Sequence, residues 1–216
     1  MFKKTTEEKV LRDPVHGYIH VDLQVVWDVI NSSWFQRLRR IRQLGGAYVV
    51  YHCAEHSRFG HSLGVYELVR RMVSEVQDIS NALNEREKVT AMLAGLLHDI
   101  GHGPYSHAFE GVTKTSHEEF TCRIIEENTE ITRILEDCCE GLSKDVADVI
   151  RHESSNPLLS QLISSQLDAD RFDYLLRDAY FTGTKYGEYD LERILRTMRV
   201  HDGKQLVIQR KWRICG

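Results

Sequence analysis

The hydrophobic positions of this 216-residue chain recur mostly three or four residues apart, which is the spacing of one face of an α-helix. The pattern predicts a helix from residue 22 to 30, a second from 34 to 44 that Gly45-Gly46 ends, and a long third after Ser57. Further helices are predicted at 85–98, 117–127, 130–139, 143–152, 157–167, 169–180 and 188–197. The fold class is therefore expected to be all-α, with short connections.

Three stretches depart from the helical period. Residues 1–20 carry turn chemistry at Asp13-Pro14 and His16-Gly17 and then a short β-like alternation, so we expect irregular or extended structure there. Residues 47–53 are β-branched and aromatic, which suits a short strand or a buried loop. Near the C-terminus, Asp202-Gly203 separates two alternating apolar runs, which predicts a minor β-hairpin over 198–208.

Composition and charge narrow the class of protein. Lys+Arg total 28 against 32 Asp+Glu, a net charge of −4 that does not call for nucleic acid, although residues 37–42 form one basic cluster. The apolar runs are far shorter than the roughly 20 residues of a membrane span, and the N-terminus lacks the apolar core of a signal peptide. The 5 cysteines form neither a disulfide framework nor a zinc knuckle. We expect a cytoplasmic protein without a membrane partner; nucleic acid is not the expected partner, although the charge balance leaves a local basic groove open.

The candidate chemistry is concentrated in residues 96–107, where an apolar run stops at His98-Asp99. In a regular helix these adjacent side chains diverge by about 100°. At an opening helix end, with Gly101 and Gly103 allowing the chain to turn, both could face one ion. A histidine nitrogen and a carboxylate oxygen suit a divalent transition metal, so we expect further ligands from elsewhere in the chain.

His61 and Asp170 are the candidates for those further ligands. His61 opens the long helix after Ser57, and Asp170 lies on the predicted helix at 169–180, where it shares a face with Asp173 and Tyr174. Taken alone, His61 is better explained as a buried core histidine. Asp168 is better explained as a helix N-cap than as a ligand.

Five segments in order resemble the HD-domain metal-dependent phosphohydrolases, and most closely their deoxynucleoside triphosphate (dNTP) triphosphohydrolase branch. They are Asp13-Pro14-Val15-His16-Gly17, residues 35–46, residues 57–65, residues 98–107, and Asp168-Ala169-Asp170-Arg171-Phe172-Asp173-Tyr174. The resemblance implies a helical HD core at 1–197, with the HD region at about 57–178. It also implies hydrolysis of a dNTP to a deoxynucleoside and inorganic triphosphate.

The resemblance places the metal ligands at His61, His98, Asp99 and Asp170. Two histidines and two carboxylates suit manganese, iron, zinc or nickel, with magnesium accompanying the triphosphate. A metal held there would lower the pKa of a bound water and polarise a phosphoryl oxygen.

The resemblance also places catalytic or triphosphate-contacting histidines at His102, His107 and His117. We expect His107 to be the general acid, oriented by Glu110 three residues later. Apart from the resemblance, His102 and His117 would also suit surface positions at helix ends.

For the substrate, the resemblance places a phosphate contact at Arg58 and the lining of the sugar and base at Gln43, Leu44, Tyr174 and Asp178. A tyrosine packed against the ribose 2′ position would favour deoxy substrates. Apart from the resemblance, Tyr174 on an apolar helix face is more often a core residue.

The resemblance further implies a homo-oligomer with an allosteric nucleotide between subunits, near Lys9-Val10, Asn31 and residues 36–39. Members of this branch are longer, and the resemblance fades after residue 208. We therefore expect a C-terminally truncated form in which residues 198–216 begin the missing region. Two rivals stay open: another HD class (a 5′-nucleotidase, cyclic-dinucleotide phosphodiesterase or guanosine-tetraphosphate hydrolase), or a nucleotide-binding remnant with little activity.

Overall fold

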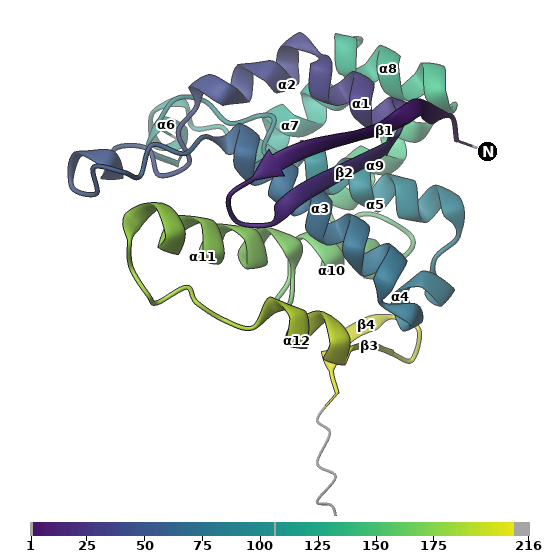
Figure 1. Ribbon diagram of the computed structural model, residues 1–216. Helices are drawn as coiled ribbons and strands as arrows, with labels where there is room; N and C mark the ends of the chain where they lie inside the picture. Colours follow the sequence, from purple (N-terminus) through teal and green to yellow (C-terminus); the bar gives the residue numbers. More distant parts are fainter. Residues whose placement is uncertain (1, 106, 210–216) are drawn as a thin grey trace, which may run out of the picture.

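The computed structural model describes residues 2–105 and 107–209, without the side chains of His107 and Phe109. Helices dominate it, which confirms the predicted all-α class (Figure 1). They are α1 (Gln24–Asn31), α2 (Ser33–Arg37), α3 (Arg58–Glu75), α4 (Gln77–Ala82), α5 (Glu85–Leu97), α6 (His107–Thr113), α7 (His117–Glu126), α8 (Glu130–Cys138), α9 (Leu142–Ile150), α10 (Pro157–Ile163), α11 (Ala169–Thr182) and α12 (Leu191–Thr197). The predicted tail at 210–216 lies outside the described residues.

Two antiparallel strand pairs accompany the helices. β3 (Met198–His201) and β4 (Gln205–Ile208) form the predicted hairpin, and both Asp202 and Gly203 adopt the positive φ, 49° and 68°, that favours Asp-Gly in such turns. The second pair, β1 (Lys4–Asp13) and β2 (Gly17–Leu23), forms a hairpin where irregular or extended chain was expected. Only β2 buries alternate side chains, Ile19 and Val21, so β1 carries almost no alternation that would reveal it in the sequence.

Two predictions for residues 34–53 are wrong. The helix predicted to reach residue 44 ends at Arg37 and continues only as a 3₁₀ turn, η1 (Leu38–Arg40). Ile41 leaves the helix because its carbonyl accepts a hydrogen bond from the Arg58 N–H at 2.9 Å. Residues 47–53 form neither a strand nor a buried loop: η2 (Ala47–Val49) is a 3₁₀ turn, and Val49 and Val50 are 66% and 73% exposed.

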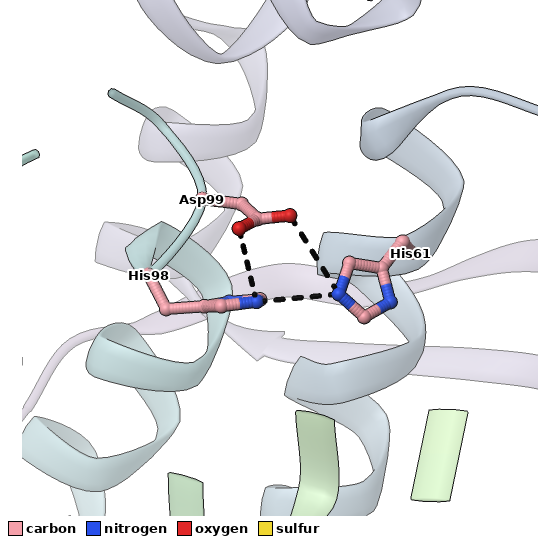
Figure 2. Close-up of side chains that lie close together, drawn as sticks. All are labelled: His61, His98 and Asp99. Atoms are coloured by element: carbon pink, nitrogen blue, oxygen red, sulfur yellow. Dashed lines mark hydrogen bonds and ion pairs between the residues drawn. The ribbon is translucent and has the colours of Figure 1, made fainter. Parts of the chain in front are cut away.

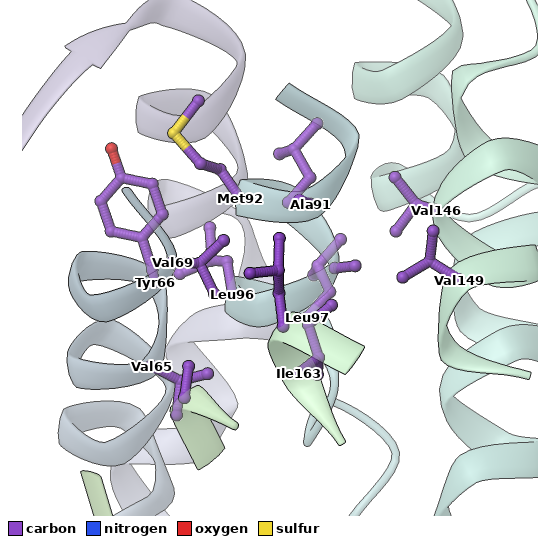
Figure 3. Packing of buried hydrophobic residues seen from close by; sticks show 14 of the residues in the cluster. Val65, Tyr66, Val69, Ala91, Met92, Leu96, Leu97, Val146, Val149 and Ile163 are labelled. Atoms are coloured by element: carbon purple, nitrogen blue, oxygen red, sulfur yellow. The ribbon is translucent and has the colours of Figure 1, made fainter. Parts of the chain in front are cut away.

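The core is built around α3 and α5. Figure 3 shows side chains of these two helices meeting side chains of α9 and α10, among them Val69, Leu97, Val146 and Ile163. Gly95 permits the close approach of α5 to α3, because a Cβ there would lie 3.0 Å from Cγ2 of Val69. In the described parts of the chain, none of the helices has the length and apolar character needed to cross a membrane.

Candidate active site

The four predicted metal ligands come together from three helices. His61 and Asp170 lie in the first turns of α3 and α11, His98 caps the C-terminus of α5, and Asp99 follows it. The end of α5 at Leu97 allows the adjacent His98 and Asp99 side chains to face the same point, as expected at an opening helix end. Figure 2 shows these two residues with His61.

The distances between the ligand atoms fit one metal ion. Oδ1 of Asp170 lies 3.0 Å from Nε2 of His61 and 3.6 Å from Nε2 of His98. The Asp99 carboxylate reaches the same two nitrogens at 3.6 and 3.5 Å, and the nitrogens are 3.3 Å apart. Donor atoms that bind one ion at about 2.1 Å lie roughly 3.0–3.4 Å from one another. The donor set therefore matches a single divalent transition metal with little rearrangement.

Each ligand histidine is oriented through its other ring nitrogen. Nδ1 of His61 lies 2.7 Å from Oδ2 of Asp173, and Nδ1 of His98 lies 2.8 Å from the Gly95 carbonyl. An Nδ1–H donor in each ring leaves Nε2 as the metal-binding atom, an arrangement typical of metal sites.

Asp173 is the centre of a buried network that the sequence did not reveal. Its fully buried carboxylate binds His61, Nε2 of His16 at 2.6 Å, and Nε and Nη2 of Arg177 at 2.8 and 2.9 Å. Arg177 also donates from Nη1 to Asp13 at 2.9 Å. The Asp-Pro-Val-His-Gly segment thus supports the site from the turn between β1 and β2. Gly64 makes room for this network, because a Cβ there would lie 1.9 Å from Oδ1 of Asp173.

The charges of the site set its protonation. Burial lowers the pKa of His61, but hydrogen bonds to Asp170 and Asp173 raise it, with a net result of about 10. Burial raises the pKa of Asp99, whereas the charges of His98 and Arg58 hold it well below its usual range. The carboxylates are therefore ionised at neutral pH, and a metal must displace a proton from His61.

Basic and imidazole groups line the same centre. Arg58, 4% exposed, donates from Nη1 to Oδ2 of Asp99, and Nε2 of His102 lies 3.3 Å from the other oxygen. Burial lowers the pKa of His102 to about 4, so its ring is neutral at pH 7. His117 stacks on His102 with ring centroids 3.8 Å apart, and its Nδ1 binds Glu110.

Glu110 therefore contacts His117, a pairing that the sequence did not predict. It accepts from both the backbone N–H of His117, at 2.9 Å, and the ring. The side chain of His107, the predicted general acid, lies outside the described residues, and its pairing with Glu110 stays a prediction.

A cavity of about 280 Å³ opens onto these groups. Arg58, Gln43 and Tyr174 of the predicted substrate residues line it, together with Val149, Ile150, His152, Ser160, Ile163 and Ser164 of the α9–α10 region. Leu44 is half-buried and Asp178 is buried, and neither lines this cavity.

His56, which the sequence did not single out, connects two of the predicted sugar-site residues. Its Nε2 lies 2.7 Å from Oδ1 of Asp178, and its carbonyl accepts the Gln43 N–H at 3.0 Å. The ring is buried and stacks on Phe181 at 4.7 Å. No spacing in the sequence links residues 43, 56 and 178, so this contact was not predictable.

Gly101 has a different role from the one predicted. Its φ lies outside the left-handed region, so the turn after His98 does not need a glycine for its backbone conformation. A Cβ at this position would lie 2.2 Å from the His117 carbonyl oxygen and 2.4 Å from the Thr121 nitrogen. Gly101 is required because the first turn of α7 packs directly against it.

A helical scaffold that gathers two histidines and two aspartates around one point can hold a divalent metal, which is a means of catalysing phosphate hydrolysis. The HD domain family model matches residues 58–178, and the chain belongs to this family.

Known relatives agree with this assignment. The chain is 52% identical over 206 residues to the uncharacterized protein YwfO of Bacillus subtilis. The aligned region covers 95% of this chain and 47% of YwfO. It is 31% identical over 243 residues to human deoxynucleoside triphosphate triphosphohydrolase SAMHD1, covering 96% of this chain and 38% of that protein. A crystal structure of a phosphohydrolase from Bacteroides thetaiotaomicron superposes with a TM-score of 0.82 at 36% identity, over 93% of this chain and 49% of that one. The chain thus spans about half the length of YwfO and less of SAMHD1.

Proposed function

We propose that this chain hydrolyses dNTPs to a deoxynucleoside and inorganic triphosphate. The observation that carries the proposal is one cavity that holds the His61, His98, Asp99 and Asp170 donor atoms together with Arg58. The similarity to SAMHD1, whose name states that activity, supports it.

Phosphoryl transfer depends mainly on positioning and charge, and different residues around the cavity provide each. Arg58 binds phosphoryl oxygens through its planar guanidinium, which its ion pair with Asp99 holds in place. His102, neutral at pH 7, is fixed by Asp99 and supports the stacked ring of His117. A divalent metal on the four ligands would supply Lewis acidity toward the phosphate.

The leaving deoxynucleoside oxygen needs a proton, and the histidines after the HD pair supply it. We retain His107 as the general acid. Glu110 holds His117 through Nδ1, and we expect the His117 ring, which lines the cavity, to contact the triphosphate.

We expect the deoxyribose beside Gln43 and Tyr174, which line the cavity, whereas Leu44 and Asp178 do not line it. Tyr174 lines the cavity and stands one helical turn before Asp178 on α11. The phenol ring limits the room beside the sugar 2′ position, which favours deoxy over ribo substrates.

The test is a product assay on the four dNTPs with added Mn²⁺ or Mg²⁺, separated by anion exchange, with metal content measured by mass spectrometry. We expect inorganic triphosphate and deoxynucleoside from the wild type. Asp99→Ala should lose metal and lower kcat/KM by about 100-fold or more, because a direct ligand matters at least as much as an outer-shell partner.

Asp137→Ala, on the exposed face of α8, is the control and should behave as the wild type. Monophosphate or pyrophosphate as the product would assign the chain to another HD class. Retention of both metal and activity in Asp99→Ala would refute the proposed site.

A further inference from the structure

His152 occupies a backbone position that normally belongs to glycine. It follows the end of α9, with a φ of 62° in the left-handed region. The hydrogen bonds around it form a Schellman motif: the His152 N–H donates to the Val149 carbonyl at 3.2 Å, and the Glu153 N–H to the Asp148 carbonyl at 2.8 Å. The residue at the centre of this motif is usually glycine, or sometimes asparagine, because a Cβ is unfavourable there.

Two other helix ends of this chain follow that rule. Gly183, with a φ of 72°, ends α11, and Asn128, with a φ of 52°, follows the end of α7. The end of α9 departs from it, and so does the end of α6, where Lys114 has a φ of 59°. Of the described non-glycine residues with positive φ, His152 is the one that lines the cavity. Local rules are most often broken at functional sites, where strain is retained for a purpose.

The contacts of the His152 ring do not explain why a non-glycine residue occupies this left-handed position. The residue is exposed, and within residues 2–105 and 107–209 its side chain has no hydrogen bond, ion pair or ring contact. Its neighbours on this wall, Val149, Ile150, Ser160, Ile163 and Ser164, are neutral. His152 is thus the ionisable group that the α9–α10 region brings to a cavity that Arg58 and the metal-ligand set also line.

We propose that His152 is a substrate-binding residue that donates a hydrogen bond from its imidazole to a phosphate oxygen of the bound triphosphate. This inference rests on the proposed function, since it requires a polyphosphate in the cavity. Arg58 and His152 then hold the phosphate chain from opposite walls. Binding of the triphosphate is the reason why a histidine stands where glycine would be more stable.

The test is His152→Gly, which restores the preferred residue and removes the ring. We expect the melting temperature to rise by about 2–4 °C as backbone strain is relieved. We expect KM for dNTP, and Kd for inorganic tripolyphosphate by calorimetry, to rise about tenfold, in line with loss of a hydrogen bond to a charged group. His152→Asn, which tolerates the same backbone and keeps an N–H donor, should restore part of the binding.

Asn128→Gly is the matched control: it makes the same backbone change at the end of α7, and Asn128 does not line the cavity. It should leave KM and Kd unchanged. Unchanged KM and Kd in His152→Gly, or a lower melting temperature, would overturn the inference. A wild type that neither hydrolyses dNTPs nor binds tripolyphosphate would instead defeat the proposed function.

Discussion

Asp173 offers the sharpest test of how the fold supports the metal centre. It is not a predicted metal ligand, but its carboxylate lies 2.7 Å from Nδ1 of His61, the ring nitrogen that does not face the metal site. We consider Asp173→Asn, which preserves shape and removes the charge. The amide can still accept on one oxygen, but its NH₂ group would face groups that already donate, such as Arg177 and His16.

Asp173→Asn should weaken metal binding and lower the free energy of unfolding, and the contacts of Asp173 indicate the size of each effect. The His61 ring loses the carboxylate that fixes its orientation, and loss of such an outer-shell partner weakens metal binding by about 10–100-fold. Arg177, 2% exposed, keeps only Asp13 as a charged partner, and breaking a buried ion pair lowers the free energy of unfolding by about 3–5 kcal/mol.

The assay is competition between the protein and a chelator for Mn²⁺ or Zn²⁺, with urea unfolding measured in parallel on the metal-stripped protein. Asp190→Asn, an exposed N-cap of α12 whose carboxylate accepts the Arg193 N–H, is the control. Asparagine is an equally good cap, so this variant should match the wild type in both measurements.

Wild-type metal affinity in Asp173→Asn would refute the reasoning, since it would mean that His61 needs no carboxylate to present Nε2. A loss of stability without a loss of affinity would show that the network serves the fold alone.

Two further predictions follow from the geometry. Gly101→Ala should lower the free energy of unfolding by about 1–3 kcal/mol, because its Cβ would meet backbone atoms of His117 and Thr121 at 2.2 and 2.4 Å; Gly111→Ala, with open space at its Cβ, is the control, and equal stability of the two would contradict the packing argument. The pKa of about 10 for His61 lies above its unfolded value, so metal-stripped protein should be most stable below about pH 6.5 and lose stability toward pH 10. Over that range metal affinity should rise about tenfold per pH unit as one proton is released, and a pH-independent chelator competition would contradict this.

The sequence allowed the helical scaffold and the donor set to be predicted, because both leave local signals. Apolar spacing marked α3, α5 and α11, and the polar pair after an apolar run marked the end of α5. The resemblance then assigned the ligand role to His61 and Asp170, already candidates, and the structure places both within reach of His98.

The predictions that were wrong or missing concern contacts between distant segments. Ile41 leaves its helix only because it pairs with Arg58, which no propensity encodes. Nothing near Asp173 shows that it binds His16, since 157 residues separate them. Gly101 looked like a turn residue because its true neighbour, α7, is visible only in the fold.

The network around Asp173 also sets the order of events during synthesis. His61, His98 and Asp99 leave the ribosome well before Asp170 and Asp173, at roughly 5–20 residues per second. For several seconds the nascent chain exposes a histidine–aspartate cluster that lacks one ligand and the carboxylate that orients another. Ion capture in its final form must therefore wait until α11 is made and docks beside α3. The final choice of ion is thus made after α3, α5 and α11 have docked, with all four donor atoms held in place by the fold.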